Sequence, residues 1–209
     1  MHIETRRQSE VARYEQVYRD PNYGLGARRR QHILQHLRRI HPKGSLLDVS
    51  TGRGEVLTLA RDLGFFPVTG TEAVAALCDG ETVHHALAHD LPFPDDSFDT
   101  VTMFDVMEHL LPEDTEAVCR ELVRVARSRI LLTVHNGPSS WRNSGGDLHI
   151  NRRASYEAWH EELREVFAPW QVIRHGAQES ISEMFEVILD QTPPRLICWC
   201  PATRRDLHG

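Results

Sequence analysis

A carboxylate followed by a glycine-containing turn is the feature of this chain best suited to binding a positively charged ligand. Residues 46–56 read LLDVSTGRGEV. The apolar residues around Asp48 predict a short buried parallel strand, and a helix is expected to begin at about Glu55. Glycines in such a turn let a ligand pack directly on the main chain. A carboxylate just before the turn would repel a pyrophosphate, but it suits a cation.

The same turn differs from two phosphate-binding patterns. A dinucleotide site requires G-x-G-x-x-G, whereas Gly52-Arg53-Gly54 is followed by Glu-Val-Leu, so the third glycine is missing. A phosphate loop requires G-K-[ST], which does not occur in the sequence. The turn therefore indicates a ligand without phosphate.

Residues 48–54, DVSTGRG, resemble the first motif of the class I S-adenosylmethionine-dependent methyltransferases, D-x-G-x-G-x-G, with Ser50 in the place of the first glycine. S-adenosylmethionine carries an ammonium group, a sulfonium group and no phosphate. The resemblance implies that this cofactor is bound by Asp48, Ser50, Thr51, Gly52 and Gly54.

Further signals of the same family follow in order along the chain. Glu72 ends the second expected strand, 24 residues after the aspartate of the first motif. An acidic residue there accepts hydrogen bonds from two ribose hydroxyls, so Glu72 and the adjacent Ala73 are implied cofactor residues. Asp90 and Leu91 match the positions that bind adenine in the family. Residues 92–101 match the family stretch P-F-x-D-x-S-F-D-x-V.

The next motif follows the fourth expected strand and reads DVMEHL, residues 105–110. In the family this turn lies beneath the methyl donor, which makes Asp105 and Val106 implied cofactor residues. The histidine of the motif could be catalytic or could only shape the pocket. Methyl transfer to an alcohol benefits from a base, and histidine is the usual base near neutral pH. The candidate bases are His109, His135 and His149.

The positions of two of these histidines follow further family patterns. His135-Asn136 resembles the P-N that follows the fifth strand, with His in place of Pro. Residues 147–151, DLHIN, resemble an H-x-N segment of methyltransferases that act on small molecules and glycans. No metal site is predicted, because Asp105, Glu108 and His109 form only one local cluster.

The expected fold is α/β, and the resemblance implies a seven-stranded Rossmann-like sheet with strand order 3-2-1-4-5-7-6 and an antiparallel last strand. Helices cover both faces. The sixth strand is expected at 170–174, and the last one at 195–200. Apolar residues at helical spacing predict a helix over 181–189, which would cover the substrate or join two subunits into a homodimer.

An N-terminal helical cap, residues 1–44, is expected to precede the methyltransferase domain, residues 45–209. Its two helices span about 4–19 and 27–40. Caps of this kind often frame the substrate, and the loop over 135–150 follows the carboxyl end of a strand, where ligands bind in α/β sheets. The candidate substrate-binding residues are Tyr14, Tyr18, Tyr23, Arg28, Trp141 and Arg142.

Charge and cysteine usage narrow the class of protein. The net charge is −6, and residues 1–44 are basic while the rest is acidic. This acidic body argues against a broad nucleic-acid surface, whereas the basic segment suggests an anionic acceptor. The four cysteines match no zinc or disulfide pattern, and no apolar run reaches membrane-spanning length, so a cytoplasmic protein is expected.

The leading hypothesis is O-methylation of a small molecule or sugar. A nucleotide- or nucleic-acid-modifying enzyme is the first alternative, although the amino-methylating motif [DNS]-P-P-[YFW] is absent after the fourth strand and no Pro-Cys pair for cytosine chemistry occurs. The second alternative is a methyltransferase-fold binding module that has lost catalysis. Ser50 and the replacement of Pro by His135 keep that alternative open.

Overall fold

The computed structural model describes residues 2–139, 142–143, 146–176 and 182–189. For residues 142 and 143 it describes the backbone alone. Across these residues no helix is both long and apolar enough to cross a membrane.

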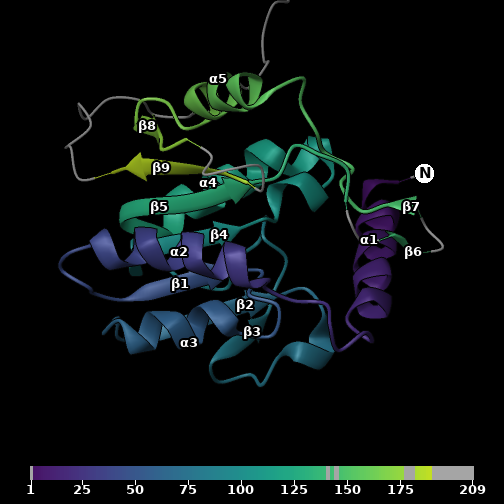
Figure 1. The fold of residues 1–209 in the computed structure, drawn as a ribbon, viewed down its shortest axis with the longest axis horizontal. Helices are drawn as coiled ribbons and strands as arrows, with labels where there is room; N and C mark the ends of the chain where they lie inside the picture. Colours follow the sequence, from purple (N-terminus) through teal and green to yellow (C-terminus); the bar gives the residue numbers. More distant parts are fainter. Residues whose placement is uncertain (1, 140–141, 144–145, 177–181, 190–209) are drawn as a thin grey trace, which may run out of the picture.

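A seven-stranded sheet forms the centre of the molecule, in the order β3-β2-β1-β4-β5-β9-β8 (Figure 1). β1 (Leu46–Val49) and β4 (Phe98–Phe104) are its central strands. The other strands are β2 (Val68–Glu72), β3 (Val83–His85), β5 (Ala126–Val134), β8 (Gln171–Arg174) and β9 (Glu183–Ile188). Strands β1 to β5 run parallel to one another, and β9 pairs antiparallel with both β5 and β8. The predicted order 3-2-1-4-5-7-6 is therefore confirmed.

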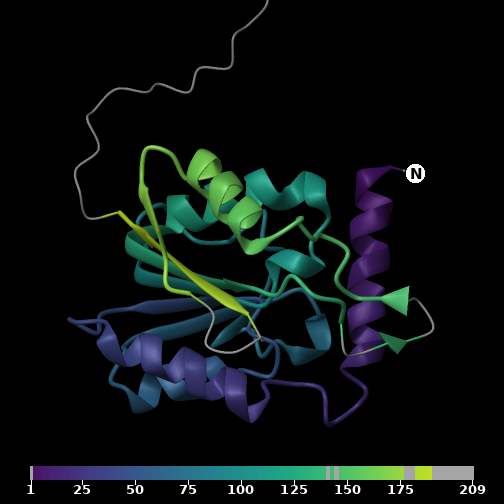
Figure 2. The same cartoon turned by 45° about the horizontal axis from the view of Figure 1, so that its top comes forward.

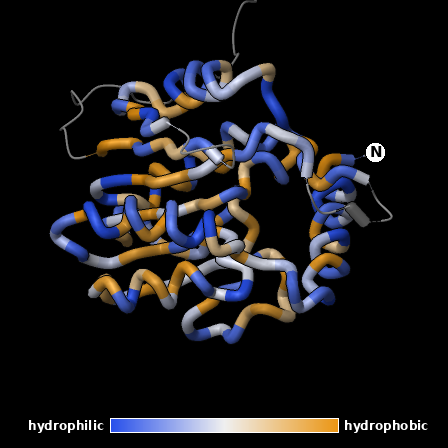
Figure 3. The backbone as a smooth tube through the Cα atoms, in the orientation of Figure 1, coloured by the Kyte–Doolittle hydropathy of each residue, from blue (hydrophilic) through white to orange (hydrophobic). Residues whose placement is uncertain are grey.

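Each face of the sheet is covered by helices, as Figures 1 and 2 show. On one face lie α2 (Ala27–Arg39) and α3 (Glu55–Asp62), and on the other lie α4 (Thr115–Val125) and α5 (Tyr156–Val166). Successive side chains of a strand point to opposite faces of the sheet, so one strand contributes to both hydrophobic cores. Leu131 packs on the α2 and α3 side, and Leu132 packs on the α4 and α5 side. Apolar residues accordingly recur along the central strands in Figure 3.

α1 (Ile3–Val17) stands apart from the sheet, at the end where the parallel strands finish (Figures 1 and 2). Val17 is its one buried residue, whereas α2 buries Ile33 and Leu37 in the same cluster as Leu46 of β1. The two helices of the expected cap thus have different surroundings: α2 is part of a layer on the sheet, and α1 is a cover. The division at residue 44 stays a prediction.

The helix predicted over 181–189 is wrong, because the described part of this stretch contains strand β9. Met184 packs in one core and Phe185 in the other, so neighbouring residues both need to be apolar. A strand buried on both faces can therefore have apolar residues at the same spacing as a helix. The amphipathic helix expected to join two subunits does not form, and the strand predicted at 195–200 lies outside the described residues.

Several elements are short. β3 is only three residues long, Val83–His85. A 3-10 turn, Ala75–Leu77, follows β2, and 3-10 turns η2 (Met107–His109) and η3 (Pro112–Asp114) precede α4. A two-stranded hairpin of β6 (Arg142–Asn143) and β7 (Gly146–Asp147) lies beside α1 (Figure 1).

Replacing Phe185 with alanine tests the assignment of β9. The side chain is fully buried, so its loss should lower the free energy of unfolding by about 3–5 kcal/mol in urea titrations. The matched control is Phe66→Ala, which removes the same ring from a side chain that is 84% exposed and should cost less than about 1 kcal/mol. Equal effects of the two changes would contradict a buried strand at 183–188.

Candidate active site

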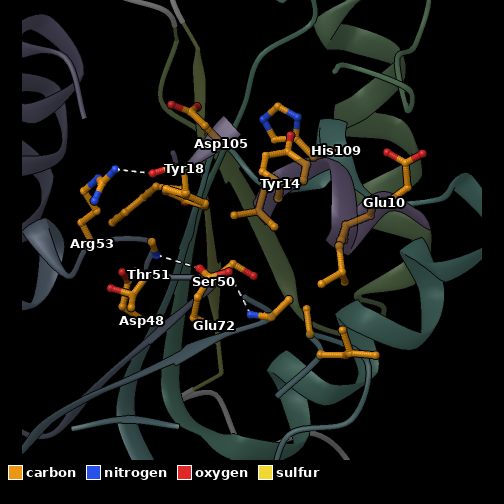
Figure 4. Close-up of a pocket in the computed structure, with 18 of the residues that line it drawn as sticks. Glu10, Tyr14, Tyr18, Asp48, Ser50, Thr51, Arg53, Glu72, Asp105 and His109 are labelled. Atoms are coloured by element: carbon orange, nitrogen blue, oxygen red, sulfur yellow. Dashed lines mark hydrogen bonds between the residues drawn. The ribbon is translucent and has the colours of Figure 1, made fainter. Parts of the chain in front are cut away.

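A cavity of about 200 Å³ opens at the carboxyl ends of β1, β2 and β4, beneath α1. Figure 4 shows Asp48 of β1 and Glu72 of β2 at one end of it and Asp105 and His109 at the other, with Tyr14 and Tyr18 between the two groups in this view. Ligands of open α/β sheets bind at this edge. The cavity is therefore the candidate active site.

The turn after β1 brings backbone close to the cavity. Ser50, Gly52 and Gly54 all have positive φ angles, of 58°, 59° and 77°. Ser50 thus adopts the left-handed conformation that glycine reaches more easily, which is why glycine is usual there in the motif. A Cβ on Gly52 would lie 2.6 Å from Tyr18 Oη, so both this close approach and the positive φ angle favour glycine.

Glu72 ties this turn to the end of β2. Its Oε2 accepts a hydrogen bond from the Gly52 N–H (2.8 Å), and its Oε1 accepts from the N–H groups of Ala73 (2.9 Å) and Val74 (3.0 Å). Burial raises the pKa of the Glu72 carboxyl, and the three N–H donors act in the opposite direction. Glu72 is thus a structural part of the turn as well as a wall of the cavity.

Asp48 is the second buried carboxyl group of the cavity. Thr102 donates its hydroxyl to Asp48 Oδ1 at 2.6 Å. Burial raises the pKa of Asp48 to about 7. Within the part of the chain that the structure describes, no lysine, arginine or histidine forms an ion pair with Asp48 or Glu72. A positively charged ligand would stabilise both carboxylates.

The wall of the cavity is rich in acidic groups. Six carboxyl groups line it, and three arginines accompany them. Two of these arginines are already paired: Arg7 binds Asp114 (2.5 Å) and Arg29 binds Asp105 (3.0 Å). The electrostatic character of the cavity is therefore negative.

Three histidines from separate segments meet near one end of the cavity. The ring centroids of His109 and His149 lie 4.7 Å apart, and those of His135 and His149 lie 5.0 Å apart. Of these three histidines, only His109 lines the cavity, and its ring centroid lies 5.3 Å from that of Tyr14. Burial lowers the pKa of His109 to about 4, and the neighbouring His149 adds to this effect. His109 is therefore neutral at physiological pH.

Buried Asn151 holds this cluster together. Its N–H donates to the Glu108 carbonyl (3.0 Å), and its side-chain amide donates to the Met107 carbonyl (3.0 Å). These bonds fix the segment 147–151 on η2, which explains how His149 reaches His109 across 40 positions of sequence. The H-x-N resemblance thus corresponds to a defined structural contact.

The predicted cofactor residues lie mostly at the cavity. Eight of them line it, namely Asp48, Ser50, Thr51, Gly52, Glu72, Ala73, Asp105 and Val106. Gly54 lies just outside, at the N-cap of α3. Asp90 is exposed, and the Leu91 N–H donates to Glu121 (2.7 Å) instead of facing the cavity. Leu87, Ala88 and His89 line the cavity in their place, because the chain turns at the bridge between Leu87 and Asp90.

Some of the predicted substrate-binding residues line the cavity and others do not. Tyr14, Tyr18 and Tyr23 line the cavity, but Arg28 is exposed and its neighbour Arg29 lines it instead. Trp141 lies outside the described residues, as does the side chain of Arg142.

The sequence reasoning missed Arg7 and Glu10, which line the cavity together with Tyr14 and Tyr18. These four residues recur every three or four positions, which places them on one face of α1. That spacing was a signal that could have identified them.

The fold and the position of the cavity are typical of ligand-binding α/β proteins, and comparisons with known proteins give a narrower class. Residues 47–132 match the family model described as "Methyltransferase domain". No curated protein matches the chain. Residues 47–132 therefore resemble a methyltransferase domain, and the described chain has the Rossmann-like fold of the methyltransferase structures that it matches.

Solved structures share this fold at low sequence identity. The PH0226 protein from Pyrococcus horikoshii OT3 is 15% identical, with a TM-score of 0.63 over 83% of this chain and 98% of the other. A 1,6-didemethyltoxoflavin-N1-methyltransferase from Burkholderia thailandensis, solved with 1,6-didemethyltoxoflavin and S-adenosylhomocysteine, is 18% identical, with a TM-score of 0.63 over 88% and 89%. DhpI, solved with S-adenosylhomocysteine, is 16% identical, with a TM-score of 0.63 over 86% and 95%.

Replacing Asp48 with asparagine should remove a pH dependence of stability. Because the folded pKa of about 7 exceeds the unfolded value of 3.8, the folded state binds more protons between these values, and the free energy of unfolding falls as pH rises through this window. Asparagine does not titrate. The stability of Asp48→Asn relative to the natural chain should therefore increase by about 2–3 kcal/mol between pH 5 and pH 8 in urea titrations. A difference that stays constant with pH would contradict the buried, protonated carboxyl.

Proposed function

We propose that this protein transfers the methyl group of S-adenosylmethionine to a hydroxyl oxygen of a small molecule or sugar. One observation carries the proposal: a single cavity connects the glycine turn and its two buried carboxyl groups with Tyr14 and His109 beneath α1. The first group of residues suits a cationic cofactor, and the second suits an acceptor that must lose a proton.

The residues of the turn fit the cofactor. Asp48 is a buried carboxyl group without a basic partner in the described chain, which suits the ammonium group of the cofactor. Glu72 Oε2 accepts one N–H and keeps a lone pair for a ribose hydroxyl. We assign adenine to the wall of Leu87, Ala88 and His89, in place of Asp90 and Leu91.

The acceptor end suits proton removal. S-adenosylmethionine supplies a methyl group on a positively charged sulfur, and its transfer to oxygen breaks the carbon–sulfur bond as the carbon–oxygen bond forms. His109 Nδ1 lies 3.1 Å from the Leu148 carbonyl, which can only accept a hydrogen bond. The proton of His109 is therefore on Nδ1, and its Nε2 lone pair can accept the hydroxyl proton of the acceptor.

The charge of the cavity favours a neutral or cationic acceptor over the anionic one suggested by the N-terminal segment. Two of the three lining arginines are paired with carboxylates, and Arg28 is exposed outside the cavity. The toxoflavin-related neighbour acts on a small molecule, which supports the small-molecule class but not the choice of oxygen. The choice of oxygen rests on the histidines.

Replacing Glu72 with glutamine should weaken cofactor binding. The ribose hydroxyls would lose charge-assisted hydrogen bonds, so the Kd for S-adenosylmethionine should rise at least about 10-fold in calorimetric titrations. Glu161→Gln makes the same chemical change on an exposed side chain of α5 and should leave the Kd unchanged. Thermal unfolding establishes that both variants are folded. An unchanged Kd in folded Glu72→Gln would remove the ribose assignment.

Pairs of acceptors that differ by one hydroxyl test the reaction itself. Each hydroxylated compound and its deoxy analogue is incubated with the protein and S-adenosylmethionine, and products are identified by mass spectrometry. We expect a mass gain of one methylene unit for hydroxyl compounds and none for their deoxy partners. Methylation of amines that ignores the hydroxyl difference would contradict O-methylation while leaving the methyltransferase class intact.

A further inference from the structure

Glu108, His109 and His149 form a compact group of potential metal ligands. One ligand atom from each of the three side chains lies within 4.8 Å of the other two. Glu108 and His109 are neighbours in η2, and the sequence alone shows only this pair. His149 joins them because Asn151 fixes its segment on η2.

Both imidazoles have the proton fixed on Nδ1. His109 Nδ1 faces the Leu148 carbonyl at 3.1 Å, and His149 Nδ1 faces the Gly137 carbonyl at 2.6 Å. Because a carbonyl only accepts hydrogen bonds, each Nδ1 carries the proton and each Nε2 keeps its lone pair. Metal-binding histidines commonly donate their other N–H to a backbone carbonyl in this way, which fixes the ring.

Glu108 supplies the third ligand. Its side chain is fully buried, and its Oε1 accepts a hydrogen bond from the His135 N–H at 3.1 Å. Its Oε2 has no hydrogen-bond partner among the described residues. A buried carboxylate oxygen is costly to leave unsatisfied, and the nearby arginine, Arg29, is bonded to Asp105. A cation beside Oε2 would satisfy it.

We propose that Glu108, His109 and His149 bind a divalent transition-metal ion at the acceptor end of the cavity. Two imidazole nitrogens and one carboxylate oxygen suit Zn²⁺, Co²⁺ or similar ions, whereas Mg²⁺ and Ca²⁺ prefer all-oxygen sites. Three protein ligands leave a coordination position open, as in catalytic zinc sites. His109 lines the cavity, so a ligand in the cavity can reach the ion.

The role of the ion rests on the proposed function, but its binding does not. A divalent ion would occupy the lone pairs of His109 and His149, and these histidines would then not act as bases. The ion would instead lower the pKa of a hydroxyl bound to it, so that the proton leaves to solvent before methyl transfer.

Cobalt titration of metal-stripped, tag-free protein tests the site without acceptor or cofactor. We expect one Co²⁺ per chain by calorimetry. His149→Asn keeps a donor for the Gly137 carbonyl but removes Nε2, and Glu108→Gln keeps an acceptor for the His135 N–H but removes the charge. Each should raise the Kd for Co²⁺ at least about 10-fold while the protein stays folded by thermal unfolding.

The chain contains a matched control in a second group of histidines. His32, His36 and His175 also make edge-to-face contacts, with ring centroids 5.0 Å apart in each pair, away from the cavity. His36→Asn should leave the Kd for Co²⁺ unchanged. Absence of Co²⁺ binding, an unchanged Kd in Glu108→Gln and His149→Asn, or loss of binding in His36→Asn would overturn the proposal.

A cofactor titration on the same metal-free sample separates the two proposals. Binding of Co²⁺ without binding of S-adenosylmethionine would leave the metal site in place and remove the proposed function. Binding of S-adenosylmethionine by protein that does not bind Co²⁺ would leave the proposed function in place and remove the metal site.

Discussion

Two carboxyl groups are buried at the ends of neighbouring strands, and in the described chain neither is paired with a basic side chain. Burial of an unpaired carboxylate is unfavourable, so the surrounding structure has to compensate. Thr102 supports Asp48, and three backbone N–H groups support Glu72. The positive φ angle of Ser50 and the close contact of Gly52 with α1 belong to the same arrangement. The cavity is thereby prepared for a positively charged ligand.

The part of the site that we assign to the cofactor was predictable because its residues are close in sequence. A strand, a turn and a second strand position Asp48, Gly52 and Glu72, and each has a local signature. The contribution of Leu87, Ala88 and His89 to the cavity wall was not predictable, since it depends on where the chain turns after β3. Likewise, only the rotation of α2 decides that Arg29 rather than Arg28 reaches the cavity.

The part of the site that we assign to the acceptor depends on contacts between distant segments. His109, His135 and His149 belong to three segments, and the sequence does not show that they meet. Asn151, which hydrogen-bonds to η2, holds the segment of His149 near His109, and the ion pair between Arg7 and Asp114 links α1 to η3. The error at β9 has a similar origin, because periodicity alone cannot distinguish a strand buried on both faces from a helix. In this chain the sheet was therefore easier to predict than the histidine cluster and the placement of α1.

Calorimetric titration of the natural protein with S-adenosylmethionine and S-adenosylhomocysteine tests the central claim most directly. The buried carboxyl groups and the glycine turn predict that both ligands bind at one site per chain, with Kd values of about micromolar. Absence of heat with both ligands, in protein that is folded by thermal unfolding, would contradict the account. The methyltransferase fold would then serve as a binding module for another ligand.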